Sequence, residues 1–329
     1  MAFEGDLDHW LHPSVWHVAV EDHALPEGNL IGGIERQLAP ARITAVQMSP
    51  RRDLAQMMQA TDGATVLVNP YTGAILAHRH GPTRTQEVLG YIHQIHLRLA
   101  MHPRSAFGPA GKAIVSSAGL LLCLLAPTGL LLWWRAKRLA IRAGGSWFRL
   151  CFDTHNVIGF YAGFFLWIAA FTGVLIGFDF AERAIYSLTN SFPPSRTRPQ
   201  QPIPATAAKA IGVDQALQVA RNAMPAASVD GFRLPLTSKD SFVIVMRVPE
   251  ETSGSAHSDV TVDRYTGRIL QVHNFLTDSS GYRWIRFNRS IHTGDIAGLP
   301  GHIVVSLSSL LLVVMVATGV VIWWKKLAQ

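Results

Sequence analysis

The residues of this chain with the clearest capacity for chemistry are histidines beside long apolar segments. His155 opens one such segment, while His102 and His292 lie ahead of two others. A neutral imidazole is the commonest metal ligand among side chains, and a histidine near a bilayer core is costly enough that it usually marks a function. We therefore expect these histidines to hold a metal or a metal-containing group. The alternative for each is an interfacial or loop histidine that is hydrogen-bonded to a carbonyl or to water.

His102 and His292 occupy equivalent positions in an internal repeat. Residues 101–135 align without a gap with residues 291–325, and 12 of the 35 positions are identical, which indicates a duplication. In each copy a histidine and several glycines precede an apolar segment. The glycines that follow His292 would let the chain pass close to a flat ligand.

A Thr-Gly pair recurs at similar depth in three apolar segments. The pairs are Thr128-Gly129, Thr172-Gly173 and Thr318-Gly319. Small residues let membrane helices approach closely, so we interpret these pairs as packing positions, with room for a porphyrin as the alternative.

The three apolar segments can cross a membrane. They cover residues 113–134, 157–178 and 303–324, and each is about 22 residues long and free of charge. A helix needs about 20 such residues to cross a ~30 Å hydrocarbon core. Basic residues fill the connection between the first two segments and follow the last one, so the positive-inside rule places that connection and the C-terminus in the cytoplasm. The net charge of +7 partly reflects this anchoring, and nucleic-acid binding is not needed to explain it.

The segments outside the membrane also repeat. Residues 68–76 and 262–270 each read as a strand, a Tyr-Thr-Gly turn and a second strand. Helices are expected before them, over 29–38 and 213–223. The predicted fold class is a membrane α-helical protein with two small α+β domains.

The predicted boundaries follow from this pattern. They are 1–87 for the first external domain, 88–135 for an amphipathic helix (88–99) plus a membrane helix, 136–154 for a cytoplasmic loop, 155–179 for a membrane helix, 180–290 for the second external domain, and 291–329 for a Gly-rich entry, a membrane helix and a cytoplasmic tail. The repeat unit is helix–domain–helix, so the first unit lacks its opening helix. We expect either that this helix lies upstream of Met1 or that the natural form has three helices.

Several motifs together resemble the PepSY-associated transmembrane family of bacterial inner-membrane proteins, over essentially the whole chain. They are residues 3–13, the two Tyr-Thr-Gly turns, and residues 92–99, 153–159 and 291–301. The resemblance implies a multi-pass inner-membrane protein with four helices and two periplasmic PepSY domains. Some members carry two b-type haems and reduce ferric siderophores. The implied cofactor is haem b, one or two per chain. The implied partners are a ferric siderophore and an electron donor, either quinol or a cytoplasmic reductase.

The resemblance also gives the histidines roles as axial ligands of haem iron. His155 would serve a cytoplasm-side haem and His292 a periplasm-side haem. The family pattern makes His96 the partner of His292, whereas the internal repeat makes it His102. His93 lies one helical turn before His96, so a pair-type metal site is conceivable as well.

Other functions are weighed against this one. The chain contains no recognisable nucleotide- or flavin-binding motif and no paired-carboxylate site, so electrons would come from a separate donor and the reaction would be outer-sphere. A non-enzymatic sensor or peptidase regulator is the main alternative, because PepSY domains elsewhere accompany peptidases. A siderophore permease is a third possibility, but the spans carry no charged residue. The remaining histidines are interpreted as surface residues, with a weak iron-holding role for His78 and His80 as the alternative.

Overall fold

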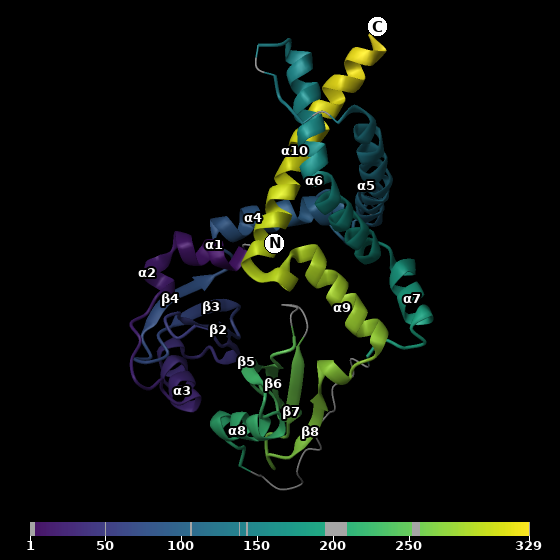
Figure 1. Cartoon of the computed structure of the whole chain (residues 1–329). Helices are drawn as coiled ribbons and strands as arrows, with labels where there is room; N and C mark the ends of the chain where they lie inside the picture. Colours follow the sequence, from purple (N-terminus) through teal and green to yellow (C-terminus); the bar gives the residue numbers. More distant parts are fainter. Residues whose placement is uncertain are drawn as a thin grey trace.

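Three long helices form one end of the molecule and a β-sheet forms the other (Figure 1). The computed structural model describes residues 4–49, 51–105, 107–137, 139–142, 144–194, 209–251 and 257–328. Among these residues, three helices are long and apolar enough to cross a membrane. We call the end of the helix bundle beside the sheet the domain end, and the end that holds the C-terminus the tail end.

The long helices are α5 (Gly108–Ala136), α6 (Trp147–Gly177) and α10 (Gly298–Leu327), and α6 packs against both of the others. The Ser146 hydroxyl caps α6 by accepting from the Arg149 amide. Helix α6 therefore begins at Trp147 rather than at residue 155, and it contains the last part of the predicted cytoplasmic loop. These two extra turns place Asp153 in a buried position, where Arg149 pairs with it at 3.2 Å.

The sheet has eight antiparallel strands in the order β4-β3-β2-β1-β5-β6-β7-β8. The first half contains β1 (Ile43–Gln47), β2 (Gln56–Ala60), β3 (Ala64–Val68) and β4 (Ile75–His80), and the second contains β5 (Ser228–Arg233), β6 (Phe242–Arg247), β7 (Ser258–Val262) and β8 (Ile269–His273). A helix precedes each set of strands: α3 (Glu27–Leu38) in the first half and α8 (Val213–Ala223) in the second. Each half is thus one helix followed by a four-stranded meander.

The two Tyr-Thr-Gly turns are built in the same way. The Asn69 side chain accepts hydrogen bonds from the next two turn amides at 2.9 and 3.2 Å, and Asp263 does the same at 2.8 and 2.7 Å. Each turn ends on a glycine with positive φ, Gly73 at 72° and Gly267 at 70°, a conformation that other residues adopt only with strain. The repeat in the sequence is therefore a repeat of turn geometry.

The two halves form one continuous sheet because β1 pairs with β5. The Asp214 carboxylate of α8 also crosses between them and accepts from the Glu27 and Gly28 amides at the start of α3. One hydrophobic core runs through both halves, and its fully buried members include Leu30, Ile34, Met58, Leu217, Phe232 and Ile244. The two predicted external domains thus share a sheet and a core.

Shorter helices connect the sheet to the membrane helices. They are α1 (Glu4–Leu11), α2 (Pro13–Trp16), α4 (Arg84–Arg98), α7 (Asp179–Leu188) and α9 (Ser280–Thr293), with the 3₁₀ turns η1 (Phe275–Thr277) and η2 (Asp295–Ala297) beside α9. Helix α4 follows the edge strand β4 and leads into α5, whereas α9 follows the opposite edge strand β8 and leads into α10. These two helices carry the candidate ligands at the domain end.

The junction of the two half-sheets predicts a stability effect. A Cβ atom on Gly231 would lie 2.7 Å from the Val46 carbonyl oxygen of the neighbouring strand. We expect Gly231→Ala to lower the free energy of unfolding by about 1–3 kcal/mol, because backbone atoms must move apart. Thermal unfolding of the full chain in detergent measures this. Gly32→Ala in α3 is the matched control: a Cβ there meets none of the described atoms beyond its own helix backbone within 4 Å, so the helix should gain up to about 1 kcal/mol.

Candidate functional site: two histidines held by Thr-Gly pairs

His292 lies in the last turn of α9 and contacts α6. Its Nδ1 atom lies 3.0 Å from the Ala169 carbonyl oxygen and 3.0 Å from the Thr172 hydroxyl. A carbonyl can only accept a hydrogen bond, so Nδ1 carries the proton and donates it. The Nε2 atom then keeps its lone pair, as a metal ligand requires.

Its surroundings keep His292 neutral. Two effects together lower the pKa of His292 to about 4. Burial is the larger one, and charge repulsion from the neighbouring His96 is the smaller. Burial also lowers the pKa of His96. Both imidazoles are therefore uncharged at neutral pH, so neither has to lose a proton before it can bind a metal.

His96 of α4 lies opposite His292. The centroids of the two rings are 6.0 Å apart and the ring planes are inclined by 29°. Two metal–imidazole bonds of 2.0–2.1 Å each, with the ring dimensions added, give about 6 Å between centroids. The helix that carries His96 is well defined at its start, since Thr83 and Gln86 form a reciprocal capping box. The pair thus has the spacing for one metal ion between two imidazoles.

His155 makes the same kind of contact at the tail end, where its partner is α10. Its Nδ1 atom lies 2.9 Å from the Thr318 hydroxyl, and the Met315 backbone adds a further hydrogen bond. Met315 precedes Thr318 by three residues, as Ala169 precedes Thr172. Each threonine hydroxyl also bonds to the carbonyls of the preceding turn of its own helix. One threonine and one carbonyl therefore hold each histidine.

The glycine after each threonine makes room for the imidazole. A Cβ atom on Gly173 would lie 3.0 Å from Cε1 of His292, and a Cβ on Gly319 would lie 3.3 Å from Cε1 of His155. The Thr-Gly pairs Thr172-Gly173 and Thr318-Gly319 therefore each contact an imidazole from a neighbouring helix. We use the name histidine seat for a Thr-Gly pair that contacts an imidazole in this way.

The two seats lie far apart along the bundle. His155 is near the tail end of α6, and Thr172, which holds His292, is near its domain end. At the helical rise of about 1.5 Å per residue, the two positions are separated by about 26 Å. This separation approaches the thickness of a hydrocarbon core.

The third Thr-Gly pair is not a histidine seat in the described part of the chain. The Thr128 hydroxyl bonds to the Leu124 and Leu125 carbonyls of its own helix. A Cβ on Gly129 would meet none of the described atoms within 4 Å. This pair lies on an exposed face of α5, and it provides an internal comparison for the other two.

The other candidate ligands lie elsewhere. His102 follows the end of α4, is exposed, and accepts a hydrogen bond from the Arg104 amide at Nδ1. The repeat aligns it with His292, but α4 ends at Arg98 because Leu99 adopts positive φ, whereas α9 continues to Thr293. His93 lies in α4 one turn before His96, and the ring that faces His292 is that of His96.

Gly294 and Gly301, which follow His292, are in close contact with each other's backbone. A Cβ on Gly294 would lie 2.6 Å from the Gly301 backbone, and a Cβ on Gly301 would collide with the Gly294 carbonyl. Gly111, which the repeat aligns with Gly301, is pressed in the same way against the Arg98 carbonyl. Gly294, Gly301 and Gly111 thus let each connecting helix turn sharply into the next membrane helix, whereas a Cβ on Gly298 would meet none of the described atoms within 4 Å.

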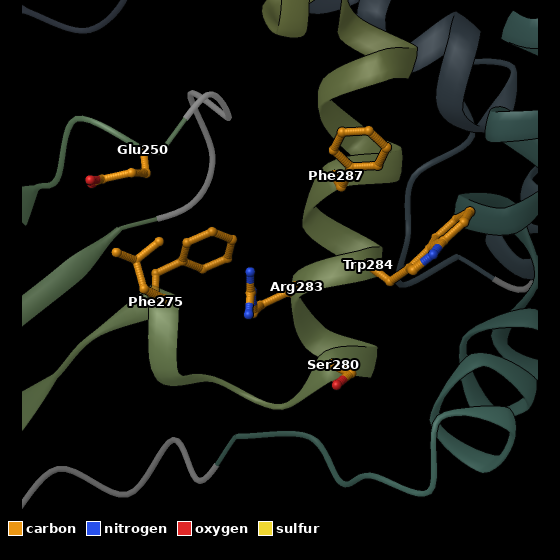
Figure 2. Close-up of a pocket in the computed structure, with 7 residues that line it drawn as sticks. Glu250, Phe275, Ser280, Arg283, Trp284 and Phe287 are labelled. Carbon is orange, nitrogen blue, oxygen red and sulfur yellow. The ribbon is translucent and has the colours of Figure 1, made fainter.

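A pocket of about 470 Å³ lies between α9 and the segment after β8. Figure 2 shows Arg283 and Phe275 pointing toward one another across this space, with Phe287 further along α9. Helix α9 carries two more arginines, Arg286 and Arg289, so the pocket lies beside a positively charged helix. Four of its lining residues, Ser280, Arg283, Trp284 and Phe287, belong to the same helix as His292, and Glu250 lines it from outside that helix.

The sequence profile of the PepSY-associated TM region matches residues 1–326. The chain belongs to this family. It is a multi-pass membrane protein with an antiparallel α+β region, as the sequence predicted. No curated protein matches the chain in a sequence search.

In this PepSY-associated chain, sequence reasoning proposed the histidines but missed their seats. Thr172 and Thr318 were interpreted as packing residues, although both bond to a proposed ligand. A signal was present: the Thr-Gly pair recurs at matching depth in helices that also lie near histidines. Its meaning depends on which helices are neighbours, and a single helix does not show that.

Proposed function

We propose that the chain is a haem-b-containing inner-membrane electron carrier that reduces ferric siderophore iron at the periplasmic face. The single observation that carries the proposal is the His96–His292 pair. Its rings have the spacing of two ligands on one metal ion, and the proton on Nδ1 of His292 leaves Nε2 available.

The donor set fits a haem iron with two imidazole ligands. Both histidines come from helices at the domain end, and both are neutral at neutral pH. A bound haem would supply reversible one-electron chemistry whose potential depends on its ligands and their hydrogen bonds. His96 and His292 would hold the iron at the domain end, while Ala169 and Thr172 fix the orientation of the His292 ring.

His155 would supply one ligand to a second haem at the tail end. No other histidine of the described chain lies at this end of the bundle, so the second ligand would have to be another group. The proposal therefore assigns one haem to the His96–His292 pair. It assigns a second haem to His155 on the condition that another group supplies the second ligand.

Basic residues support the proposed orientation. Arg135, Lys137, Lys325 and Lys326 lie at the tail end, and such residues favour the cytoplasmic side. The domain end and the sheet would then lie in the periplasm. Electrons would enter from quinol or a cytoplasmic reductase near the tail end.

The pocket on α9 is the proposed site for the ferric chelate. Arg283 would pair with an anionic chelator, and Phe275 and Phe287 would contact its apolar parts. Arg283 and His292 are separated by about 14 Å along the helix axis at 1.5 Å per residue. Release of iron would follow from reduction alone, because Fe(II) binds hard oxygen ligands less tightly than Fe(III), and no general acid or base is required.

The test is spectroscopic. Protein purified in detergent is expected to show a b-type haem spectrum after reduction with dithionite. After the excess reductant is removed, a ferric tris-catecholate added without oxygen should reoxidise the protein and yield one ferrous ion per electron, measured with a ferrous-specific dye. Folded protein that contains no haem after expression with ample haem supply would overturn the proposal and favour the sensor or peptidase-regulator function.

A further inference from the structure

Three potential metal ligands converge at the edge of the sheet, away from the histidine seats. Asp62 lies in the turn between β2 and β3, and His78 and His80 lie on the edge strand β4. One ligand atom from each residue can be chosen so that all three lie within 4.8 Å of one another. All three side chains are exposed, so an ion in solution can reach them.

The register of the sheet explains why these residues meet. Residues two apart on a strand point to the same face, so His78 and His80 lie side by side, with ring centroids 5.2 Å apart. The Ala64 residue of β3 pairs with His80, and Asp62 precedes Ala64 across a tight turn. As a result, the Asp62 Oδ2 atom lies 3.9 Å from Nε2 of His80.

The turn also fixes the direction of the carboxylate. The Ala64 amide donates a hydrogen bond to the Asp62 Oδ1 atom at 3.0 Å. Gly63 between them has a φ of 82°, which a side chain would strain. With Oδ1 engaged, Oδ2 is the oxygen that lies nearest the His80 imidazole.

We propose that Asp62, His78 and His80 form a binding site for a divalent transition-metal ion. Two imidazoles and one carboxylate are ligands that suit Zn²⁺, and metal–ligand distances of about 2.0–2.2 Å place tetrahedral donors about 3.4 Å apart. The three ligand atoms, now within 4.8 Å of one another, would have to approach by about 1.4 Å at most, and their side chains are exposed. Three protein ligands leave at least one coordination position for water, which makes the site exchangeable rather than structural.

The inference is independent of haem binding. The ligands belong to the sheet, and none of them contacts His96, His292 or His155 among the described interactions. The site therefore stands even if the proposed reductase activity fails.

The experiment is a metal titration of the full chain, purified in detergent with an affinity tag that contains no histidine. Co²⁺ binding is followed by its visible absorption, and Zn²⁺ is then added as the competitor. We expect one equivalent of Co²⁺ to be lost, or its affinity to fall at least tenfold, in Asp62→Asn, His78→Ala and His80→Ala. His23→Ala is the matched control, since His23 is an exposed histidine of the same half and lies outside the cluster.

A second readout covers variants that might be misfolded. Zn²⁺ should raise the unfolding temperature of the unmodified chain and of His23→Ala, and should not do so in the three ligand variants, whose unfolding temperatures without metal should match. Equal Co²⁺ stoichiometry and affinity in the unmodified chain and in a His78→Ala/His80→Ala double variant would overturn the proposal. An equal loss in His23→Ala would also overturn it.

Discussion

Replacing His292 by alanine is expected to remove one full equivalent of haem from the purified protein. The substitution deletes one of two imidazoles whose ring centroids are 6.0 Å apart. His96→Ala should have the same effect, because one remaining imidazole holds haem far less tightly than two. Haem content per chain, measured by the pyridine haemochrome method, checks the result.

The control for this prediction is His102→Ala. His102 is the position that the repeat aligns with His292, yet it is exposed and its Nδ1 atom accepts a bond from its own loop. We expect unchanged haem content in His102→Ala. Retention of haem in both His292→Ala and His96→Ala would refute the assignment, and loss of haem in His102→Ala alone would move the ligand to that loop. Imidazole added to His292→Gly should restore part of the spectrum if the histidine acts as a ligand.

The second large effect is expected from the histidine seats. Thr172→Val keeps the shape of the side chain but removes the hydroxyl that bonds to Nδ1 of His292. Loss of a hydrogen bond behind a metal-bound histidine typically costs 10- to 100-fold in metal affinity or activity. We therefore expect Thr172→Val to weaken haem retention by about 10- to 100-fold and to shift the reduction potential of the haem.

The chain supplies its own control in the third pair. Among the described residues, the hydroxyl that Thr128→Val removes bonds only to carbonyls of its own helix, so haem content and potential should stay unchanged. Thr172→Ser keeps the hydroxyl and should behave like the unmodified protein. If Thr172→Val and Thr128→Val gave the same potential and the same haem content, the seat would be a packing feature only.

Much of the fold followed from local patterns. Helix α8 has the bounds that periodicity predicted, Val213–Ala223, and the three membrane helices contain the predicted apolar segments except for the last residue of 157–178. The Tyr-Thr-Gly turns were predictable because their geometry depends on neighbouring residues, such as Asn69 and its two acceptor contacts. These elements require no information from distant parts of the chain.

The pairing of β1 with β5 was not predictable in that way. Val46 and Phe232 lie opposite each other although they belong to different repeats, and each strand already has a partner within the meander of its own repeat.

The candidate site was also not predictable from local sequence alone. His102 matched His292 in sequence, but Leu99 ends α4 early with positive φ, so His96 reaches the position opposite His292. A local backbone conformation therefore determines which of the two rings lies opposite His292.

The continuous sheet has a mechanical consequence for the His96–His292 gap. Helices α4 and α9 start from opposite edges of the eight strands, which are about 34 Å apart at 4.8 Å per strand spacing, and they converge on two rings 6.0 Å apart. The sheet and the two helices therefore form a triangle, and the two imidazoles lie where the helices meet. A change in the curvature of the sheet would thus change the distance between the two imidazoles.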